Sequence, residues 1–327
     1  GLGEAYMDNW WECHALDQFM AKVLHANLAE LLKKVWRIQW NTLKSKLFNQ
    51  QSSRRAFMVG QIHYDIGNEL YQSMLDKHMQ YTCGYWKDAT TLDQAQEAKL
   101  ELVCRKLKLE PGMKVLELGC GFGGFAHYAA TKYGVDVTGY TVSKEQAKFG
   151  KELCQGLPVD IRLADYRTAG GEYDRVVSIG LMEHVGYKNY GTYMKLTNRL
   201  LKDDGIALVH TIGSNASCSA CNSWTAKYIF PNGMLPSIAQ LGKAMEKQFV
   251  MEDWHNFGED YDKTLMAWHE NFKKAWPTLK DNYSDRFYRM WEYYLLSCAG
   301  GFRSRSMQLW QIVMTKQGTS APCCRII

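Results

Sequence analysis

Residues 115–124 read VLELGCGFGG, an apolar run followed by four glycines within six residues. The run predicts a buried strand, and the glycines predict a tight turn at which the backbone can approach a ligand before a helix begins. A strand, a glycine-rich turn and a helix in this order are typical of nucleotide-binding α/β sheets. The motif therefore limits the possible folds to a few, but it leaves the nucleotide open.

Strand-like and helix-like segments alternate from this turn onward. The expected strands are 114–119, 135–141, 159–166, 173–180, 205–213, 249–257 and 307–316. Helices are expected at 125–134 and 143–154, and two aromatic helices between about 260 and 298. Because parallel strands need crossover helices between them, we expect an α/β fold with a Rossmann-like, mostly parallel sheet of seven strands.

Composition shifts along the chain suggest separate parts. The expected parts are a small helical domain at 1–48, a linker at 49–60 and a large domain at 61–327. A helical, aromatic region is expected to run through 63–75, 79–86 and 91–107, with later insertions near 214–235 and 259–298. The chain begins at Gly1 without a methionine, so we expect the natural protein to extend further at this end.

The cysteine and hydropathy patterns favour a reducing compartment. No stretch approaches the roughly 20 apolar residues that span a bilayer, and no signal peptide is visible. The ten cysteines lack a disulfide-like spacing, which favours a cytoplasmic location. Cys218 and Cys221 form one CxxC pair without a second matching pair, so no zinc site is expected.

A basic, amphipathic segment precedes the linker. Between His25 and Phe57 there are seven basic residues and one acid, Glu30, while apolar residues recur at spacings of three and four. Such a helix can lie on an anionic membrane, or it can pack on the protein with a solvated basic side. No nucleic-acid-binding motif accompanies the segment, so nucleic acid is not an expected partner.

The spacing of acidic residues distinguishes between nucleotides. Gly119, Gly121 and Gly124 satisfy GxGxxG, but an NAD site also needs an acid about 20 residues later, where Tyr140 and Thr141 lie. The acid instead precedes the glycines, at Glu117. The pattern E-x-G-x-G-x-G resembles the first motif of Rossmann-like S-adenosylmethionine methyltransferases. The resemblance implies that Glu117 faces the ammonium group of the cofactor.

Further motifs extend the resemblance over nearly the whole chain. They are HYDIGNELY, MQYTCGYW, LELGCGFGG, DYR at 165–167, SIGLMEHVG, HTIGS, KYIFPNG, DWHNFG, YDKTLMAW and FRSRSMQLWQ. On these motifs the chain is identified as a member of the cyclopropane-fatty-acyl-phospholipid synthases, with a class I methyltransferase sheet. The amino-terminal unit favours the bacterial phospholipid enzymes over the shorter mycolic-acid branch. Glu117 replaces the family's usual Asp and Phe122 its usual Trp, and both keep the chemical type.

The resemblance implies a reaction at a lipid. A methyl group moves from S-adenosylmethionine to a cis double bond of a phospholipid acyl chain, a proton is lost and a cyclopropane ring closes. An alkene is a weak nucleophile, so the reactants must be positioned closely. Water would capture the carbocation, so the site must be dry. Aromatic faces can stabilise the cation, and residues 81–86 and 254–268 supply candidates.

The family's base is a bound bicarbonate, as the resemblance implies. Its pocket carries over onto Cys83, Glu183, His210, Tyr261 and the backbone of Ile212. Glu183 follows the fourth expected strand and His210 ends the fifth, which places both at the carboxyl edge where α/β sheets bind ligands. Glu183, His184 and His210 could also bind a metal, but no spacing demands it.

The resemblance also implies the cofactor residues and the partners. The implied cofactor residues are Tyr81, Thr82, Glu117, Gly119, Gly121, Thr141, Ser143, Gln146, Asp165 and Tyr166. Gln146 has a competing role, because Ser143 and Gln146 have the spacing of a helix capping box. The implied partners are membrane phospholipids, an anionic membrane surface at the inner face of the bacterial membrane, and a second copy of the chain.

The sequence leaves rival functions open. A related enzyme could leave a methyl or methylene branch, or a hydroxyl from water capture, because all share the cation. An NAD-dependent oxidoreductase is disfavoured by the missing acid after the second strand. A silent lipid-binding homologue is expected to lose Glu183 or His210, and this chain has both.

Overall fold

The structure, a computed structural model, describes residues 1–26, 67–219 and 222–326. The predicted linker at 49–60 and all seven basic residues of the predicted amphipathic helix lie outside these described residues. Within the described ranges, no helix is long and apolar enough to cross a bilayer.

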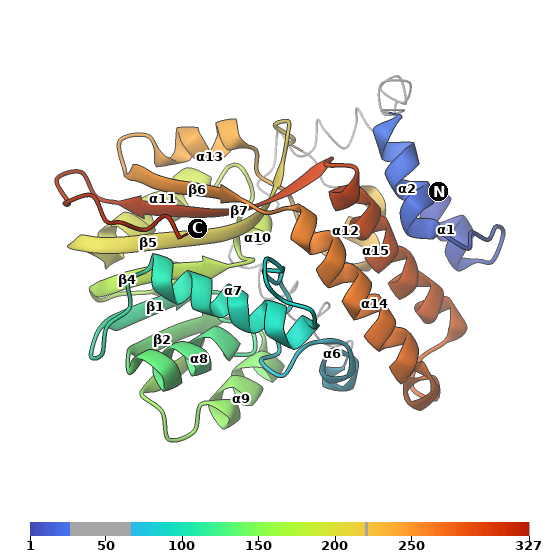
Figure 1. Ribbon diagram of the computed structural model, residues 1–327, viewed down its shortest axis with the longest axis horizontal. Helices are drawn as coiled ribbons and strands as arrows, with labels where there is room; N and C mark the ends of the chain where they lie inside the picture. The colour runs from blue at the N-terminus through green and yellow to red at the C-terminus, as the bar shows by residue number, and fades with distance from the viewer. Residues whose placement is uncertain (27–66, 220–221, 327) are drawn as a thin grey trace.

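A seven-stranded sheet forms the centre of the molecule (Figure 1). In the order of the sheet, the strands are β3 (Val159–Leu163), β2 (Asp136–Thr141), β1 (Lys114–Leu118), β4 (Tyr173–Ile179), β5 (Leu201–Ser214), β7 (Met307–Thr315) and β6 (Val250–Asn256). The first five are parallel, and β7 runs antiparallel to both β5 and β6. The predicted mostly parallel, seven-stranded sheet is confirmed.

Helices cover both faces of this sheet. One group is α7 (Leu92–Lys106), α8 (Gly124–Tyr133) and α9 (Lys144–Leu153), and the other includes α11 (Tyr190–Leu200) and α13 (Ile238–Met245). Alternating residues of β1 pack on opposite sides, because Val115 joins the apolar cluster of α7 and α8 while Leu116 joins that of α11 and α13. Glu117 alternates with Leu116, so β1 directs it toward α7 and α8.

A second, aromatic layer packs at the carboxyl edge of the sheet. Its helices are α6 (Asn68–Met74), α14 (Glu259–Leu279) and α15 (Asp285–Arg303), with Trp268, Phe272 and Trp291 fully buried between them. The two predicted aromatic helices are confirmed, although α15 extends beyond residue 298. The predicted loop insertion at 214–235 contains a short helix, α12 (Ser223–Tyr228).

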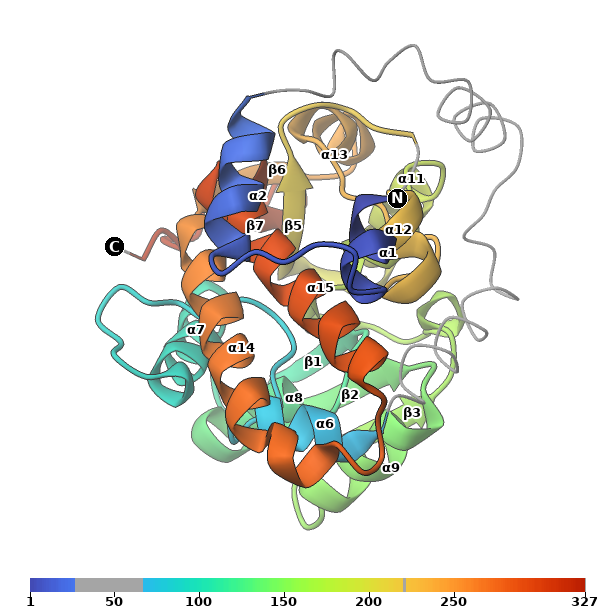
Figure 2. The same cartoon turned by 90° about the vertical axis from the view of Figure 1, so that its right-hand side faces the viewer.

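The described amino-terminal residues form two short helices. They are α1 (Leu2–Met7) and α2 (Leu16–His25), and both pack against α15 (Figure 2). Tyr6 donates a 2.6 Å hydrogen bond to Glu292 on α15, and Arg289 lies 4.2 Å from the Tyr6 ring centroid. The start of the chain is thereby attached to the aromatic layer.

Residues 79–86 are not helical, so their inclusion in a helical region was wrong. The backbone donors of Met79 and Gln80 bond to Asp76, while those at the end of the segment bond to groups distant in the sequence. Gly84 N–H donates to Thr264 Oγ1 at 3.0 Å, Trp86 N–H to Asp260 Oδ2 at 2.8 Å and Tyr85 N–H to the Ala95 carbonyl at 2.8 Å. Because these partners satisfy the backbone, the segment needs no secondary structure of its own.

Gly124 at the start of α8 allows this segment to lie against the glycine-rich turn. A Cβ at Gly124 would lie 2.0 Å from the His78 carbonyl oxygen and 2.4 Å from Gln80 Nε2. We expect Gly124→Ala to lower the free energy of unfolding by about 3 kcal/mol, because a backbone oxygen must move. Gly242 in α13 is the control, since its Cβ would meet nothing within 4 Å.

Denaturant unfolding measures both variants. Gly242→Ala should raise the free energy of unfolding by about 0.5 kcal/mol, because alanine is the better helix former. Equal changes in the two variants would contradict the close approach of residues 78–80 to α8.

Candidate active site

The glycine-rich turn leaves backbone and open space at the end of β1. Gly119 and Gly121 have φ values of 77° and 54°, a region that favours glycine. A Cβ at Gly121 would meet nothing within 4 Å, so the space beside it is open. The turn therefore presents bare backbone at the start of α8, where a ligand can approach closely.

Glu117 lies buried behind this turn with one carboxyl oxygen unsatisfied. It is 2% exposed, accepts a hydrogen bond from the Ala126 N–H, and Oε2 has no partner. Burial raises the pKa of Glu117 to about 8, while the nearby ammonium of Lys99 opposes the rise. A buried oxygen of this kind fits a cationic ligand group such as an ammonium.

Thr141, Ser143 and Gln146 are joined by hydrogen bonds at the end of β2. Thr141 Oγ1 donates to Gln146 Oε1 at 2.9 Å, and Ser143 Oγ accepts from the Gln146 N–H at 3.3 Å. The Ser143 N–H donates to Thr141 Oγ1, not to the Gln146 side chain. The capping box considered for Gln146 is therefore wrong, because only its serine half forms.

Asp165 presents a second unsatisfied carboxyl oxygen after β3. Oδ1 accepts bonds from the backbone and side chain of Arg167, both at 2.9 Å, and it caps the short 3₁₀ helix Tyr166–Thr168. Oδ2 is buried without a partner. The Tyr166 ring lies edge-on to Tyr193, with centroids 5.9 Å apart.

Glu183 forms a third buried acidic position beyond β4, on α10 (Met182–Val185). Oε1 accepts a 2.7 Å hydrogen bond from the Ile212 N–H, and Oε2 is buried without a partner. Burial raises the pKa of Glu183 to about 7. The backbone of Ile212, predicted to line the pocket, thus holds the carboxyl group of Glu183.

His210 on β5 is buried and has one ring nitrogen unsatisfied. It is 1% exposed, and burial lowers its pKa well below the usual value. The Gln311 amide nitrogen lies 3.3 Å from His210 Nδ1, while Nε2 is buried without a partner. With Gln311 donating to Nδ1, the ring proton lies on Nε2, which makes Nε2 a hydrogen-bond donor.

Cys83 and Tyr261 complete the predicted pocket. Cys83 is fully buried, and Thr264 Oγ1 lies 3.9 Å from its Sγ. Tyr261 is one helical turn before Thr264 on α14. Burial raises the pKa of Tyr261, and its electrostatic interactions with Cys83 and Glu183 raise this pKa further. Burial raises the pKa of Cys83 well above its usual value, so the thiol is protonated and is a poor nucleophile.

Aromatic rings pack against one another near these residues. The Tyr81 ring centroid lies 5.2 Å from those of both Tyr71 and Trp268, and the Tyr81 hydroxyl donates to the Tyr294 hydroxyl at 2.9 Å. Phe230 also lies near Tyr81, at 6.3 Å. Tyr81 and Trp268 were predicted as candidates, whereas Tyr71, Phe230 and Tyr294 lie outside the predicted ranges.

Comparison with known proteins identifies the scaffold. The model of the family described as mycolic acid cyclopropane synthetase matches residues 51–312. The chain belongs to this family. The cyclopropane-fatty-acyl-phospholipid synthase of Escherichia coli K12 is 55% identical over 97% of this chain and 83% of its own length. The resemblance drawn from the motifs is confirmed.

Solved structures of the cyclopropane synthetase family share the fold. The cyclopropane synthase MmaA2 from Mycobacterium tuberculosis has a TM-score of 0.74 at 29% identity, over 80% of this chain and 98% of that one. The mycolic acid cyclopropane synthase CmaA1, complexed with SAH and CTAB, has a TM-score of 0.75 at 31% identity with the same coverage. The predicted class I methyltransferase fold is confirmed, and the chain is an S-adenosylmethionine-dependent methyltransferase of this family.

Two residues near the predicted pockets escaped the sequence reasoning. Lys99 on α7 is fully buried and faces Glu117, but its neighbours in sequence are typical of a solvated helix face. Gln311 pairs with His210 only through the register of β5 and β7. Aligning the alternating side-chain directions of β5 and β7 could have indicated that Gln311 lies beside His210. The sequence around Lys99 gave no comparable signal.

His184, on α10, packs against an aromatic ring. Burial lowers its pKa to about 4, and its ring faces Phe230 at 5.6 Å. In the part of the chain that the structure describes, no three His, Cys, Asp or Glu side chains lie together as a metal site requires.

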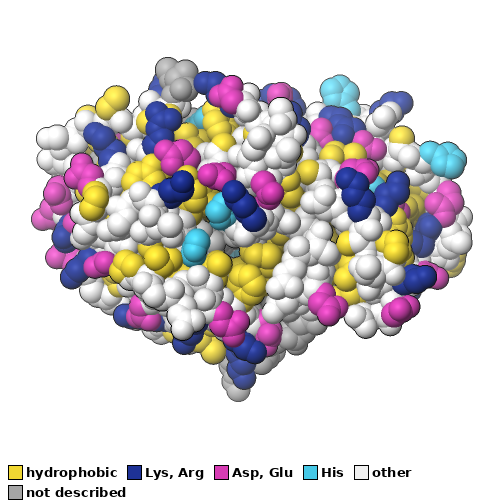
Figure 3. Space-filling model, turned by 60° about the horizontal axis from the view of Figure 1, so that its bottom comes forward, with side chains coloured by type: hydrophobic (Ala, Val, Ile, Leu, Met, Phe, Trp, Pro, Cys, Tyr) yellow, Lys and Arg dark blue, Asp and Glu magenta, His cyan; other side chains and the backbone are white. Residues whose placement is uncertain are grey.

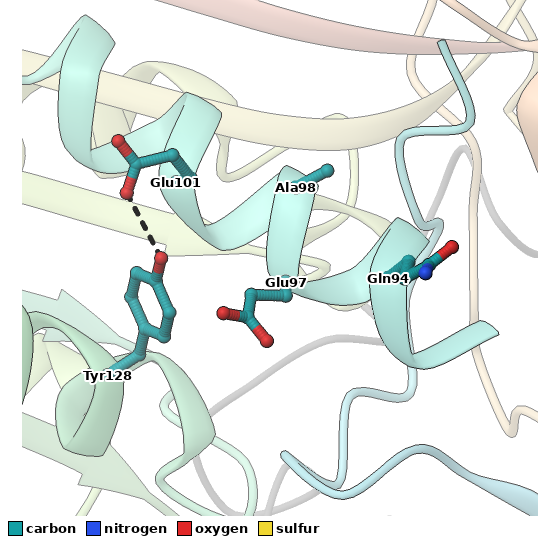
Figure 4. Close-up of a pocket in the computed structure, with 5 residues that line it drawn as sticks. All are labelled: Gln94, Glu97, Ala98, Glu101 and Tyr128. Atoms are coloured by element: carbon teal, nitrogen blue, oxygen red, sulfur yellow. Dashed lines mark hydrogen bonds between the residues drawn. The ribbon is translucent and has the colours of Figure 1, made fainter. Parts of the chain in front are cut away.

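An open hollow on the outer side of α7 does not coincide with the predicted site. It is lined by Gln94, Glu97, Ala98, Glu101 and Tyr128 (Figure 4). Glu101 accepts a 3.0 Å hydrogen bond from the Tyr128 hydroxyl across its edge. None of the predicted cofactor or pocket residues lines it, so we assign it no catalytic role.

Proposed function

We propose that this enzyme transfers a methylene group from S-adenosylmethionine to the cis double bond of unsaturated acyl chains in membrane phospholipids, forming cyclopropane fatty acids. The observation that carries the proposal is the pair of buried, unpaired polar atoms Glu183 Oε2 and His210 Nε2. With Gln311 donating to His210 Nδ1, one of these atoms is an acceptor and the other a donor. His210 does not end β5, as the sequence predicted, but it pairs with Ile179, the last residue of β4, so it lies at the carboxyl end of that neighbouring strand. The E. coli relative named as a phospholipid enzyme supports the substrate class.

The residues after β1, β2 and β3 fit S-adenosylmethionine, which supplies an electrophilic methyl group when bound. Glu117 Oε2 would accept a hydrogen bond from the ammonium, and Asp165 Oδ2 one from the adenosine. Gly119 and Gly121 admit the amino-acid end to the turn. The other residues proposed to bind it are Thr141, Ser143, Gln146 and Tyr166, with Tyr81 and Thr82 as the cover.

The reaction balances without a redox partner. The π electrons of the double bond form the new bond to the methyl carbon as the bond from that carbon to sulfur breaks. The electron pair of the broken bond stays on sulfur, so S-adenosylhomocysteine is the leaving group, and a cation remains on the acyl chain. Loss of one proton from that methyl group closes the ring, so the acyl chain gains one CH₂. The chain's own contribution is to position the alkene, exclude water and direct the proton to a base.

Aromatic side chains are suited to the first two tasks. Trp268 is fully buried and Tyr81 packs against it, so their faces can stabilise a nearby cation without reacting with it. Their apolar bodies also keep water from the cation. Lipid access would use the insertions that include α12, α14 and α15.

The third task falls to the Glu183 pocket, which fits bicarbonate. Bicarbonate, when bound, supplies a weak base. Glu183 Oε2 would accept a hydrogen bond from its hydroxyl group, and His210 Nε2 would donate one to its oxygen. Cys83 and Tyr261 close the pocket, and the Ile212 N–H orients Glu183.

Turnover in carbon-dioxide-free buffer tests this pocket. We expect the initial rate on unsaturated phospholipid vesicles to rise with added bicarbonate and then to saturate. An initial rate that is the same at every bicarbonate concentration, with S-adenosylmethionine saturating, would exclude bicarbonate as the base.

Membrane contact is proposed for the basic segment between His25 and Phe57. The face in Figure 3 carries acidic and basic side chains interspersed, so it offers no single-sign field toward an anionic membrane. We assign electrostatic attraction to the basic segment because it holds seven basic residues and one acid, and we propose a peripheral enzyme at the inner face of the bacterial membrane. A homodimer is proposed on the same resemblance.

Neutralising Lys33, Lys34 and Arg37 tests this assignment. We expect the triple glutamine variant to bind anionic vesicles at least ~10-fold more weakly at low salt, because each basic residue contributes about 1 kcal/mol near such a surface. High salt should remove most of the difference, and vesicle flotation measures it. Vesicle binding equal to that of the unchanged protein would assign the helix to protein packing instead.

A methyl-branching enzyme is the rival. It would share Glu117 and the aromatic lining, and only its product would differ.

A further inference from the structure

Lys99 is a buried ammonium whose direct partners are both neutral. It is 0% exposed in the middle of α7, and Nζ donates to Gln80 Oε1 at 2.6 Å and to Thr82 Oγ1 at 2.8 Å. Burying a cation is unfavourable unless the surroundings compensate. A lysine at such a position therefore needs a reason beyond packing.

Its two acceptors belong to the extended segment that covers the predicted site. Helix α7 holds this segment at one side, because Gln96 Nε2 also donates to the Thr82 carbonyl at 2.7 Å. Helix α14 holds the other side through Thr264 and Asp260. Gln96 and Lys99 are three residues apart on α7, so both project toward the same stretch of chain.

The same acceptors touch the ends of two central strands. The Gln80 amide lies 2.4 Å from where a Cβ of Gly124 would be, at the turn that follows β1. The Thr82 methyl group lies 2.8 Å from where a Cβ of Gly180 would be, just beyond β4. Lys99 thus holds the two side chains that rest on the cofactor turn and on the strand leading to Glu183.

The charge of Lys99 also acts on both predicted pockets. The titratable groups that face it are Asp76, Cys83 and Glu117. Its ammonium favours the ionised carboxylate of Glu117 and disfavours a proton on His210. Asp76, on the same side, accepts bonds from the backbone of His78 and Gln80 at 2.8 Å each and fixes the start of the segment.

We propose that Lys99 is a positioning residue that holds residues 80–83 closed over the amino-acid end of bound S-adenosylmethionine and over the pocket at Cys83. It acts through Gln80 and Thr82 rather than by touching the reacting atoms. The inference rests on the proposed cofactor site, in which Glu117 and Thr82 contact that end of the cofactor.

Lys99→Met, which keeps the length of the side chain and removes its charge, tests the inference. We expect the Kd for S-adenosylmethionine to rise roughly 10-fold, because the cover is no longer held in place. In the absence of ligand, alkylation of Cys83 by N-ethylmaleimide should accelerate at least ~10-fold, because the segment opens locally. Peptide mass spectrometry resolves Cys83 from the reference Cys104, which is fully buried on α7.

Lys106→Met is the matched control. Lys106 is also 0% exposed on α7, but it bonds to Asp253 at 3.0 Å and lies 3.2 Å from His255 Nδ1. This variant loses a buried ammonium without releasing residues 80–83. Its melting temperature should fall because the core is disturbed. The Kd for S-adenosylmethionine and the rate of Cys83 alkylation should both stay within about 2-fold of those of the unchanged protein.

Two results would overturn the proposal. One is a Lys99→Met protein with unchanged Kd and unchanged Cys83 alkylation, and the other is equal changes in Lys106→Met. If Lys99→Met does not fold, Gln80→Met is the second variant, because it removes one of the two acceptors of Lys99. It should raise both the Kd and the Cys83 alkylation rate. Unchanged values in Gln80→Met would also overturn the proposal. If the proposed cofactor site is itself wrong, Glu117→Gln will leave S-adenosylmethionine binding unchanged. That result distinguishes failure of the cofactor site from failure of the Lys99 proposal.

Discussion

Replacing Glu183 by glutamine should lower turnover by about 100-fold or more while the Kd for S-adenosylmethionine stays within about 2-fold. The glutamine keeps the shape of the side chain, but it removes the negative charge that would bind the bicarbonate hydroxyl. Glu183 lies beyond β4, whereas the proposed cofactor residues follow β1, β2 and β3. Turnover and calorimetric titration with the cofactor therefore separate the two roles.

A pH profile and a control variant sharpen this test. Burial raises the pKa of Glu183 to about 7, so the rate of the unchanged enzyme should rise with pH through about 7, and this limb should vanish in Glu183→Gln. Glu101→Gln is the control, because Glu101 bonds to Tyr128 and Tyr133 at the outer hollow. Full turnover in Glu183→Gln, or weaker cofactor binding with turnover intact, would contradict the assigned role.

Glu117→Gln should weaken S-adenosylmethionine binding about 100-fold and yet stabilise the ligand-free protein at pH 8. The binding loss follows because the buried carboxylate is the proposed partner of the cofactor ammonium. The stability gain follows because burial raises the pKa of Glu117 from 4.5 to about 8. A raised carboxyl pKa means that ionising the group in the folded protein is unfavourable.

The sign of the pH dependence follows from proton binding. Below about pH 4.5 the carboxyl group is protonated in both states, so the variant gains nothing. As the pH rises toward 8, the unfolded chain releases its proton while the folded protein keeps it, so the unchanged protein loses stability by a few kcal/mol, at about 1.4 kcal/mol per pKa unit. Thermal melting of both ligand-free proteins at pH 5 and pH 8 measures the growing difference. A constant difference across this range would contradict the burial of an unsatisfied Glu117.

The sheet and its functional edge could be predicted from sequence because local patterns specify them. The apolar runs, the glycine-rich turn and the missing acid after β2 depend only on neighbours in the chain. The carboxyl-edge rule then places Glu183 and His210 at one edge without any knowledge of side-chain packing.

Long-range packing decided the features that sequence reasoning missed. Residues 79–86 look helical by composition, but Thr264 and Asp260 on α14 accept hydrogen bonds from the backbone of Gly84 and Trp86. Lys99 has Glu97 and Glu101 as near neighbours in sequence, so the sequence predicts that it belongs to a solvated helix face. Packing of α7 on the sheet buries it instead. The capping box of Ser143 and Gln146 failed because Thr141 offered Gln146 a closer partner.

The central claim is tested most directly by the product. The protein is incubated with S-adenosylmethionine and vesicles of unsaturated phospholipid, and the released acyl chains are analysed by mass spectrometry. The account predicts acyl chains that gain one CH₂ and lose their olefinic signals. A methyl branch with water added, or a retained double bond, would contradict cyclopropane formation.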